Sequence, residues 1–270
     1  MPLKLLIIDA YSPGARARVK ESDATHAGEL LAASVRVHDA EANIDIVDFD
    51  ADGAALPQPL ENYGGVLWTG SNMTIHRLNP MIEAQIDLCR NVYDTGVPQF
   101  GICWGLQMGC VAAGGEVQAN PKGPEIAWAR GVTLTEEGRA HPFTSVKPET
   151  YDALCWHSDA VTQLPEGATL LATNDKGVQA AIFRRGEGEF WATQYHLEYH
   201  GDEVAALLDQ FRDYLIESEI FTADGLAAMQ GEMRSLAAEG KKGAVPEELR
   251  PVVDPLVRSA ELGAWLGSIR

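Results

Sequence analysis

The run of residues 97–107, Val-Pro-Gln-Phe-Gly-Ile-Cys-Trp-Gly-Leu-Gln, constrains the fold of this chain more than any other part of the sequence. Its apolar residues predict a buried strand over Gln99–Ile102, and a helix is predicted to begin at Trp104. Cys103 lies between them at a sharp turn. Glycines at 101 and 105 suit such a turn, because a side chain at either position would collide with the backbone. The pattern therefore predicts a strand, an elbow with a cysteine at its tip, and a helix.

The predicted position of Cys103 favours a reactive thiol. It faces the first turn of the helix, whose unpaired N–H groups and dipole favour the thiolate, which is the nucleophilic form. A free cysteine is also commonly a buried core residue, and the elbow alone leaves that alternative open. Catalysis would require a base elsewhere in the chain.

A candidate base follows the apolar run 188–195, which predicts a strand. His196-Leu-Glu198 comes directly after it. In an extended segment residues i and i+2 point the same way, so Glu198 can orient the imidazole of His196. A cysteine with a histidine held by an acidic group is an activated nucleophile. A lone histidine at a strand end is also often a surface residue, but only His196 combines a strand end with a carboxylate two residues later.

The two motifs together resemble the class I glutamine amidotransferases, which carry a Gly-x-Cys-x-Gly-x-Gln elbow and a His-x-Glu near the end of the domain. The resemblance covers residues 3–216 and extends to the GMP-synthase type of amidotransferase domain and to γ-glutamyl amide or peptide hydrolases. It implies a flavodoxin-like α/β fold and acyl transfer through a thioester. The matching residues are Gly101, Cys103, Gly105, Gln107, His196 and Glu198.

Three segments between the motifs extend the resemblance in the expected order. Residues 69–71, Thr-Gly-Ser, stand where the family places its oxyanion loop. Residues 125–128 resemble a Glu-x-Gly-Trp segment, and residues 156–159, Trp-His-Ser-Asp, resemble the Ser-His-Gly-Asp segment that lines the glutamine pocket.

The resemblance implies roles for individual residues. Cys103 would be the nucleophile, with His196 as acid and base and Glu198 as its orienting carboxylate. Backbone N–H groups near Gly70 and at Trp104 would hold the oxyanion. Substrate contacts are implied for Gln107, Ser71, His157 and Ser158. For Ser158, a role as a plain turn residue is an equal alternative.

The sequence departs from the family pattern at two positions. Leu197 stands where the family usually has proline, and Leu106 stands where it usually has histidine. Proline fixes φ, so its loss predicts a looser loop that keeps both functional side chains. The resemblance therefore carries over the Cys–His–Glu triad and leaves the substrate preference open.

Apolar runs alternate with helical patterns in the first half of the chain. This alternation predicts a mostly parallel sheet with helices on both faces, and shorter runs in the second half predict a small antiparallel section. Strands are expected at 4–8, 44–48, 65–68, 99–102, 117–119, 126–129, 132–134, 168–172, 178–184 and 189–195. Helices are expected at 25–40, 80–94, 104–113 and 202–217. The fold class is α/β, with Cys103 at the carboxyl end of a central strand, where open α/β sheets hold their sites.

The amino-acid composition argues against some classes of binding partner. The net charge is −18, and no basic cluster is longer than Lys241-Lys242, so nucleic acid and anionic membranes are poor partners. The apolar N-terminal run 3–8 is only long enough for a strand, which predicts neither a signal peptide nor a membrane span. Four cysteines make no disulfide framework and lack metal-site spacing. We expect a cytoplasmic protein without a metal or other cofactor.

The chain is predicted to divide into a catalytic domain, residues 1–218, and a helical C-terminal extension, residues 219–270. Residues 223–238 and 255–269 each have an apolar helix face, and residues 239–246 form a polar linker with helix breakers. These helices could pack back on the domain, form a homodimer contact, or cover the mouth of the active site.

Three functions are compatible with the sequence. The first is a free-standing hydrolase of N-substituted γ-glutamyl amides or peptides. The second is the glutaminase component of an amidotransferase, which would hand ammonia to a separate synthase partner. The third is a catalytically idle binding or regulatory subunit, which an intact triad disfavours. No synthase module or phosphate-binding loop is recognisable, which favours the first. Tryptophans near the motifs, at positions 68, 104, 128 and 156, suit an aromatic amine or are simply core residues.

Overall fold

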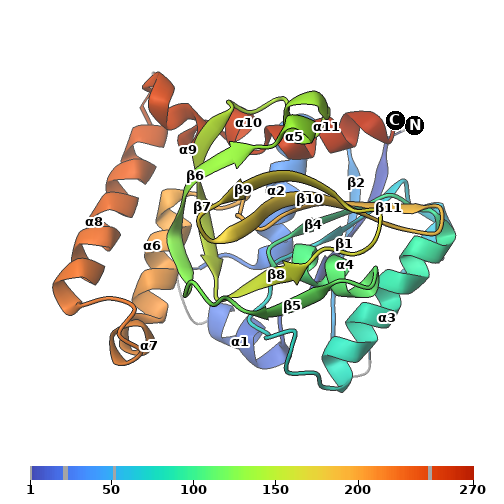
Figure 1. The fold of residues 1–270 in the computed structure, drawn as a ribbon, viewed down its shortest axis with the longest axis horizontal. Helices are drawn as coiled ribbons and strands as arrows, with labels where there is room; N and C mark the ends of the chain where they lie inside the picture. The colour runs from blue at the N-terminus through green and yellow to red at the C-terminus, as the bar shows by residue number, and fades with distance from the viewer. Residues whose placement is uncertain (1, 21–23, 51–52, 243–244) are drawn as a thin grey trace.

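The computed structural model describes residues 2–20, 24–50, 53–242 and 245–270, and these form a three-layer α/β structure around one large mixed sheet (Figure 1). Its nine described strands run in the order β2-β1-β3-β4-β11-β10-β9-β6-β7. A separate antiparallel pair, β5-β8, lies beside it. The strands are β1 (Lys4–Asp9), β2 (Asn43–Asp48), β3 (Gly65–Trp68), β4 (Gln99–Ile102), β5 (Glu116–Ala119), β6 (Glu125–Leu134), β7 (Thr150–His157), β8 (Asp159–Gln163), β9 (Thr169–Asn174), β10 (Gly177–Arg185) and β11 (Gly188–Thr193).

The first half of the sheet is parallel and the second half is antiparallel. Strands β2, β1, β3, β4 and β11 pair in parallel, and β11 also pairs antiparallel with β10. Strands buried on both faces read as continuous apolar runs, and residues 5–8 of β1 are all fully buried. The α/β class with a parallel core and an antiparallel section is thereby confirmed.

Helices cover both faces of the sheet. On one face, α2 (Ala27–His38) and α11 (Ala260–Ser268) pack against β1 and β4 in one apolar cluster. On the other, α3 (Pro80–Thr95) and α4 (Trp104–Ala112) form a second cluster with Leu6 and Ile8 of β1 and with Val66 and Trp68 of β3. Because α4 follows β4 directly, the elbow between them lies at the carboxyl end of the central strand.

The structure describes further helices and turns outside these two layers. They are α1 (Pro13–Lys20), α5 (Glu136–Ala140), α6 (Gly201–Gln210), α7 (Arg212–Glu217), α8 (Ala223–Gly240), α9 (Arg250–Val253) and α10 (Pro255–Arg258), with 3-10 turns at Leu60–Asn62 and Glu247–Leu249. In the part of the chain that the structure describes, none of the helices combines the length and apolar character that a membrane span requires.

Several predicted elements differ from the structure. The helix expected at 202–217 is broken at Phe211, whose ring packs on Trp156 with centroids 5.6 Å apart. The helix expected at 255–269 is broken at Ser259, whose hydroxyl donates to the carbonyl of Pro255. The runs 126–129 and 132–134 belong to the single strand β6, with a register shift between them. Strands β7 and β8 and helices α1, α5 and α9 were not predicted.

The C-terminal helices pack back on the rest of the chain. Helix α8 lies against α6 through Leu226, Met233 and Leu236 (Figure 1). The ring of Trp265 in α11 lies 5.5 Å from that of Phe100 in β4, inside the main core. The boundary at residue 218 stays a prediction, and residues 243–244 of the predicted linker lie outside the described residues.

Candidate active site

Cys103 occupies a strained backbone position between β4 and α4. Its φ of 52° and ψ of −99° lie in a region that side-chain-bearing residues rarely adopt. The flanking glycines permit the turn: a Cβ at Gly105 would lie 2.9 Å from the carbonyl oxygen of Trp68, and one at Gly101 would lie 2.5 Å from the ring of Phe190. The backbone N–H of Cys103 donates to Thr193 O at 2.8 Å. These contacts produce the elbow that the sequence predicts.

The thiol of Cys103 lies at the start of a helix and in a buried position. Helix α4 begins at Trp104, so its first-turn N–H groups lie beside the sulfur and favour a negative charge there. The Cys103 side chain is only 5% exposed, and Sγ lies 3.5 Å from the carbonyl oxygen of Trp156. The indole N–H of Trp104 donates to Gln85 at 2.8 Å, which fixes the first helical residue.

The structure brings His196 and Glu198 together in the loop after β11. Nδ1 of His196 lies 2.6 Å from Oε1 of Glu198, and both side chains are buried. The backbone N–H of His196 donates to Leu154 O at 2.8 Å. The ring of Tyr199 stacks on the imidazole with centroids 3.8 Å apart and planes 8° apart. Carboxylate and stacking ring together fix the tautomer and plane of the imidazole.

The Cys103 thiol lies within electrostatic reach of the imidazole. Within the described residues, Nε2 of His196 is buried and has no hydrogen-bond partner of ordinary geometry. Burial opposes a charged imidazole, but the negative charges of Glu198 and Cys103 and their hydrogen bonds outweigh it and raise the pKa of His196 to about 10. The arrangement favours a charged imidazole near the thiol, oriented by a carboxylate.

The predicted oxyanion loop approaches the same imidazole. A Cβ at Gly70 would lie 2.9 Å from Cε1 of His196, so only glycine fits there. The hydroxyl of Thr69 accepts from the N–H of Ala10 at 3.0 Å and donates to Gly70 O at 2.8 Å. The hydroxyl of Ser71 donates to Ala10 O at 2.8 Å, so it fixes the loop, and its substrate contact stays a prediction.

A search against family models matches residues 27–213 to the model described as glutamine amidotransferase class-I. The chain belongs to the class I glutamine amidotransferase family. A curated relative from Pseudomonas sp., "Gamma-glutamyl-L-1-hydroxyisopropylamide hydrolase", is 34% identical over 219 residues, which are 80% of this chain and 74% of the relative.

Other relatives are more distant. The GMP synthase [glutamine-hydrolyzing] of Neisseria meningitidis serogroup B is 30% identical over 134 residues, which are 49% of this chain and only 25% of that enzyme. A crystal structure of a glutamine amidotransferase from Thermotoga maritima has a TM-score of 0.67 at 19% identity, covering 100% of this chain and 98% of that one. At that identity the structural likeness shows the class I amidotransferase fold alone.

Two of the predicted substrate residues of this amidotransferase-family chain, Gln107 and His157, are buried and belong to a polar wall beside the elbow. The side-chain amide of Gln107 donates to Asp159 O and to the side chain of Gln194, each at 3.2 Å. Ser158 is exposed, and its carbonyl accepts from the N–H of Asn120 at 2.9 Å. Contact of Gln107 and Ser158 with substrate stays a prediction.

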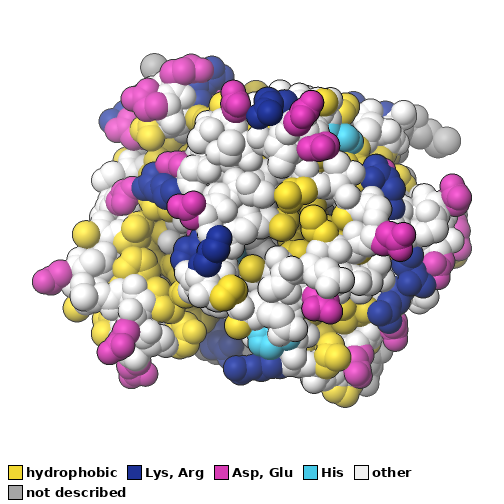
Figure 2. Space-filling view, in the orientation of Figure 1, with side chains coloured by type: hydrophobic (Ala, Val, Ile, Leu, Met, Phe, Trp, Pro, Cys, Tyr) yellow, Lys and Arg dark blue, Asp and Glu magenta, His cyan; other side chains and the backbone are white. Residues whose placement is uncertain are grey.

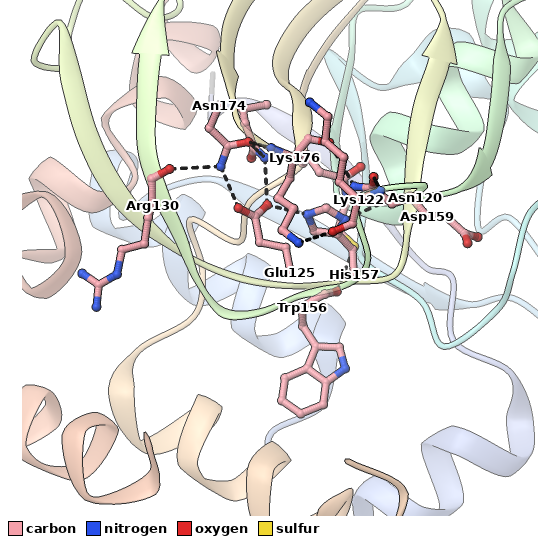
Figure 3. Close-up of polar contacts among 12 residues, drawn as sticks. Asn120, Lys122, Glu125, Arg130, Trp156, His157, Asp159, Asn174 and Lys176 are labelled. Carbon is pink, nitrogen blue, oxygen red and sulfur yellow. Dashed lines mark hydrogen bonds and ion pairs between the residues drawn. The ribbon is translucent and has the colours of Figure 1, made fainter. Parts of the chain in front are cut away.

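His157 is committed to contacts within the protein. Its Nε2 lies 2.8 Å from Oε2 of Glu125 and its Nδ1 lies 2.9 Å from Asp159 O (Figure 3). A carbonyl only accepts, so Nδ1 carries a proton, and a second proton lies between Nε2 and the carboxylate. Asn174 and Gln179 donate to the same carboxylate at 2.6 and 2.9 Å. Both nitrogens of the imidazole are thus paired within the protein, and the ring holds this wall together.

Sequence reasoning missed two kinds of site residue. Tyr199 follows Glu198 directly, and an aromatic residue beside the motif was a signal that could have been used. Glu125 was recognised as part of a motif without a role, and its partner His157 lies on β7, which was not predicted. The pairing of β6 with β7 that joins these residues leaves no local signal in the sequence.

One cluster of metal-ligand type lies outside this site. Candidate ligand atoms of Asp9, His26 and Asp48 lie within 4.8 Å of one another, and His26 and Asp48 line an open cavity of about 980 Å³. The two imidazole nitrogens lie 3.2 and 3.4 Å from the two carboxylates, and Asp9 accepts from the N–H of Gly28. Protein contacts therefore account for the cluster.

Proposed function

We propose that this chain hydrolyses the γ-amide bond of an N-substituted γ-glutamyl compound through a γ-glutamyl thioester on Cys103. The observation that carries the proposal is the Cys103, His196 and Glu198 arrangement in a chain that aligns over 80% of its length with a γ-glutamyl amide hydrolase. The GMP synthase of Neisseria meningitidis serogroup B aligns with only half of this chain, and this chain spans a quarter of that enzyme.

In the proposed first half-reaction, the Cys103 thiolate attacks the γ-carbonyl carbon. Backbone N–H groups near Gly70 and at Trp104 hold the oxyanion, and each such donor lowers the barrier by roughly 3 kcal/mol. The imidazolium of His196 gives its proton to the amine nitrogen, and the C–N bond breaks. The products of this step are the free amine and a thioester.

In the second half-reaction, the now neutral Nε2 of His196 takes a proton from water, which attacks the thioester carbon. The C–S bond breaks, glutamate leaves and the thiolate–imidazolium pair is restored. Glu198 keeps its hydrogen bond to Nδ1 throughout and stabilises the imidazolium. The sum is one amide and one water converted to glutamate and an amine.

An apolar amine suits the surface beside the thiol. The carbonyl of Trp156 faces Cys103, and its half-buried ring packs on Phe211. In Figure 3 this ring points away from the polar wall around His157. Figure 2 shows hydrophobic side chains gathered over α6, between α8 and the β6–β7 edge, and the partly buried apolar residues of this region include Ile126 and Met229. We infer that an alkyl or aryl amine leaves along this band.

The glutaminase component of an amidotransferase is the second candidate, because the matching family model is that of the amidotransferases. In that case glutamine would be the substrate, and a separate synthase would receive ammonia. An idle regulatory subunit is disfavoured by the complete Cys103–His196–Glu198 arrangement.

The test is an assay of the purified chain, alone, against glutamine and a panel of N-alkyl and N-aryl γ-glutamyl amides. We expect at least one substituted amide to be hydrolysed faster than glutamine, with glutamate and the amine formed in equal amounts. Cys103→Ser is the inactive control. Glutamine hydrolysis that begins only after a synthase partner is added, without cleavage of any substituted amide, would reverse the order of the two candidates.

A further inference from the structure

The loop that carries His196 and Glu198 is held at two points by the C-terminal helices. The residues that hold it, Arg258 and Glu261, lie beyond the region 27–213 that matches the amidotransferase family model. No local sequence pattern connects residues near 260 with the predicted triad.

Arg258 holds the centre of the loop. Its Nε donates to the carbonyl of Leu197 at 3.2 Å, and Leu197 is the residue between His196 and Glu198. The guanidinium is itself fixed, because Nη1 donates to the carbonyls of Val252 and Val253, each at 3.3 Å. These carbonyls belong to the last residues of α9, a usual place for a cation.

Glu261 holds the start of the loop. Its carboxylate is fully buried and accepts a hydrogen bond from the hydroxyl of Tyr195, the residue before His196. Lys147 Nζ lies 3.5 Å from the same carboxylate and donates to the carbonyl of Arg258 at 3.1 Å. The buried cation thus ties Glu261 and Arg258 into one unit.

We propose that Arg258 is a positioning residue for the His196–Glu198 pair: its hydrogen bond fixes the backbone at Leu197, and its positive charge acts on the Glu198 carboxylate. The inference rests on the catalytic role proposed above for that pair. Leu197 lacks the fixed φ that proline would supply, so an external hydrogen bond to its carbonyl is a way to restrain the same loop.

Arg258 acts on the His196–Glu198 pair through its charge as well as through its hydrogen bond. Burial lowers the pKa of Arg258, and the negative charges of Glu198 and Asp254 oppose that effect. A cation beside Glu198 disfavours the protonated form of His196 and favours the thiolate. Other ionisable groups near this pair are Glu203, Tyr11 and Tyr199, and those near Arg258 include Asp254 and His200.

Two substitutions separate the hydrogen bond from the charge. Arg258→Lys keeps the charge and loses the planar guanidinium that bonds three carbonyls, whereas Arg258→Met loses both. On the γ-glutamyl amide that the wild type hydrolyses, we expect kcat to fall several-fold for Lys and roughly tenfold or more for Met. KM should change less than about twofold, because Arg258 lies behind the loop and not against substrate.

A second readout needs no substrate. The rate of Cys103 alkylation by iodoacetamide, measured against pH, reports the ionisation of the Cys103–His196 pair. Arg258→Met should move this profile to higher pH by on the order of half a unit, and Arg258→Lys should leave it in place. The other three cysteines are fully buried, and Cys103→Ser identifies the modified thiol.

Arg250→Met is the matched control, because Arg250 is a partly exposed arginine of α9 that pairs with Glu247 and Asp254. It should change neither kcat nor the alkylation profile. The proposal is overturned if Arg258→Met folds and has the wild-type kcat and the wild-type pH profile of alkylation. It is also overturned if Arg250→Met shows the same fall in kcat and the same shift of the profile. If Arg258→Met does not fold, the Lys variant decides: an unchanged kcat overturns the hydrogen-bonding role. If the wild type cleaves no γ-glutamyl amide, the proposed function fails, while the alkylation profiles still decide the role of Arg258.

Discussion

The proton on His196 is the residue-scale feature on which the proposed chemistry depends most. Glu198 and Cys103 raise the pKa of His196 to about 10 from an ordinary value of 6.5, although burial acts the other way. A raised pKa in the native state stabilises the fold fully below about pH 6.5, and this stabilisation is lost as pH rises through about 10. The imidazolium is also the proposed acid for the leaving amine. Stability and activity should therefore both fall toward pH 10.

Glu198→Gln tests this account. With the carboxylate removed, the alkaline limb of kcat/KM should move to lower pH by about one unit or more, because the largest favourable charge on the imidazolium is gone. The measurement is kcat/KM against pH, with Glu217→Gln, an exposed carboxylate of α7, as the control. An unmoved alkaline limb in Glu198→Gln would remove Glu198 from the proposed triad.

Cys103→Ser should abolish turnover, with a loss of at least about 10³-fold, because a serine hydroxyl is a far weaker nucleophile at neutral pH. The fold should survive the nearly isosteric change, as near-UV circular dichroism would show. Cys110→Ser and Cys155→Ser are the comparison variants, since both thiols are buried and burial raises their pKa values. Loss of activity in these variants, with retention in Cys103→Ser, would contradict the elbow assignment.

At the scale of an element, the elbow depends on how closely β3 approaches the start of α4. Gly105→Ala would place a Cβ 2.9 Å from the backbone oxygen of Trp68, and backbone cannot move aside cheaply. We expect a loss of about 1–3 kcal/mol in the free energy of unfolding, together with reduced activity. Gly231→Ala in α8 is the matched control, because its Cβ meets nothing within 4 Å, and alanine should stabilise that helix. The measurement is the free energy of unfolding of both variants in urea. Equal values for Gly105→Ala and Gly231→Ala would contradict the close approach of β3 to α4.

The sequence predicted the elements whose residues carry a complete local signal. Continuous apolar runs predicted β1, β3 and β4, and the cysteine between Gly101 and Gly105 predicted the elbow. Helix breaks at Phe211 and Ser259 were missed, because the side chains of both residues are turned to partners elsewhere in the fold. The partner of His157, on β6, was likewise not predictable, since strand pairing brings residues together over distances that no local pattern encodes.

The residues of the candidate site also divide into those with a local sequence signal and those without one. His196 and Glu198 were predictable because they are two residues apart, and Cys103 because its turn requires flanking glycines. Arg258 is 61 residues from Leu197 in sequence, and its role depends on how α10 packs. A sequence reading that ends at the family motif therefore describes the triad without the residue proposed to hold its loop.

At the scale of the whole molecule, the C-terminal helices complete the core. From the sequence alone, residues 219–270 could pack back on the domain, pair two copies or cover the site. Leu262, Trp265 and Leu266 lie in one buried cluster with residues of β1 and β4. A homodimer through this segment stays a proposal, and it would have to use the residues of these helices that remain exposed, such as Leu256.

Trp265→Ala tests whether the chain unfolds as one unit. Trp265 is 1% exposed, lies 5.5 Å from the Phe100 ring, and fills the space above Gly65, where a Cβ would lie 2.6 Å from its ring. Its truncation should cost about 3–5 kcal/mol of unfolding free energy. Leu256→Ala, in the same C-terminal segment but 57% exposed, should change stability by less than about 0.5 kcal/mol.

Because Phe100 belongs to the strand that leads into Cys103, loss of activity and loss of structure should share one urea midpoint. An activity midpoint that stays at the wild-type value in Trp265→Ala, while helical signal is lost earlier, would instead show that the C-terminal helices unfold separately from the catalytic core.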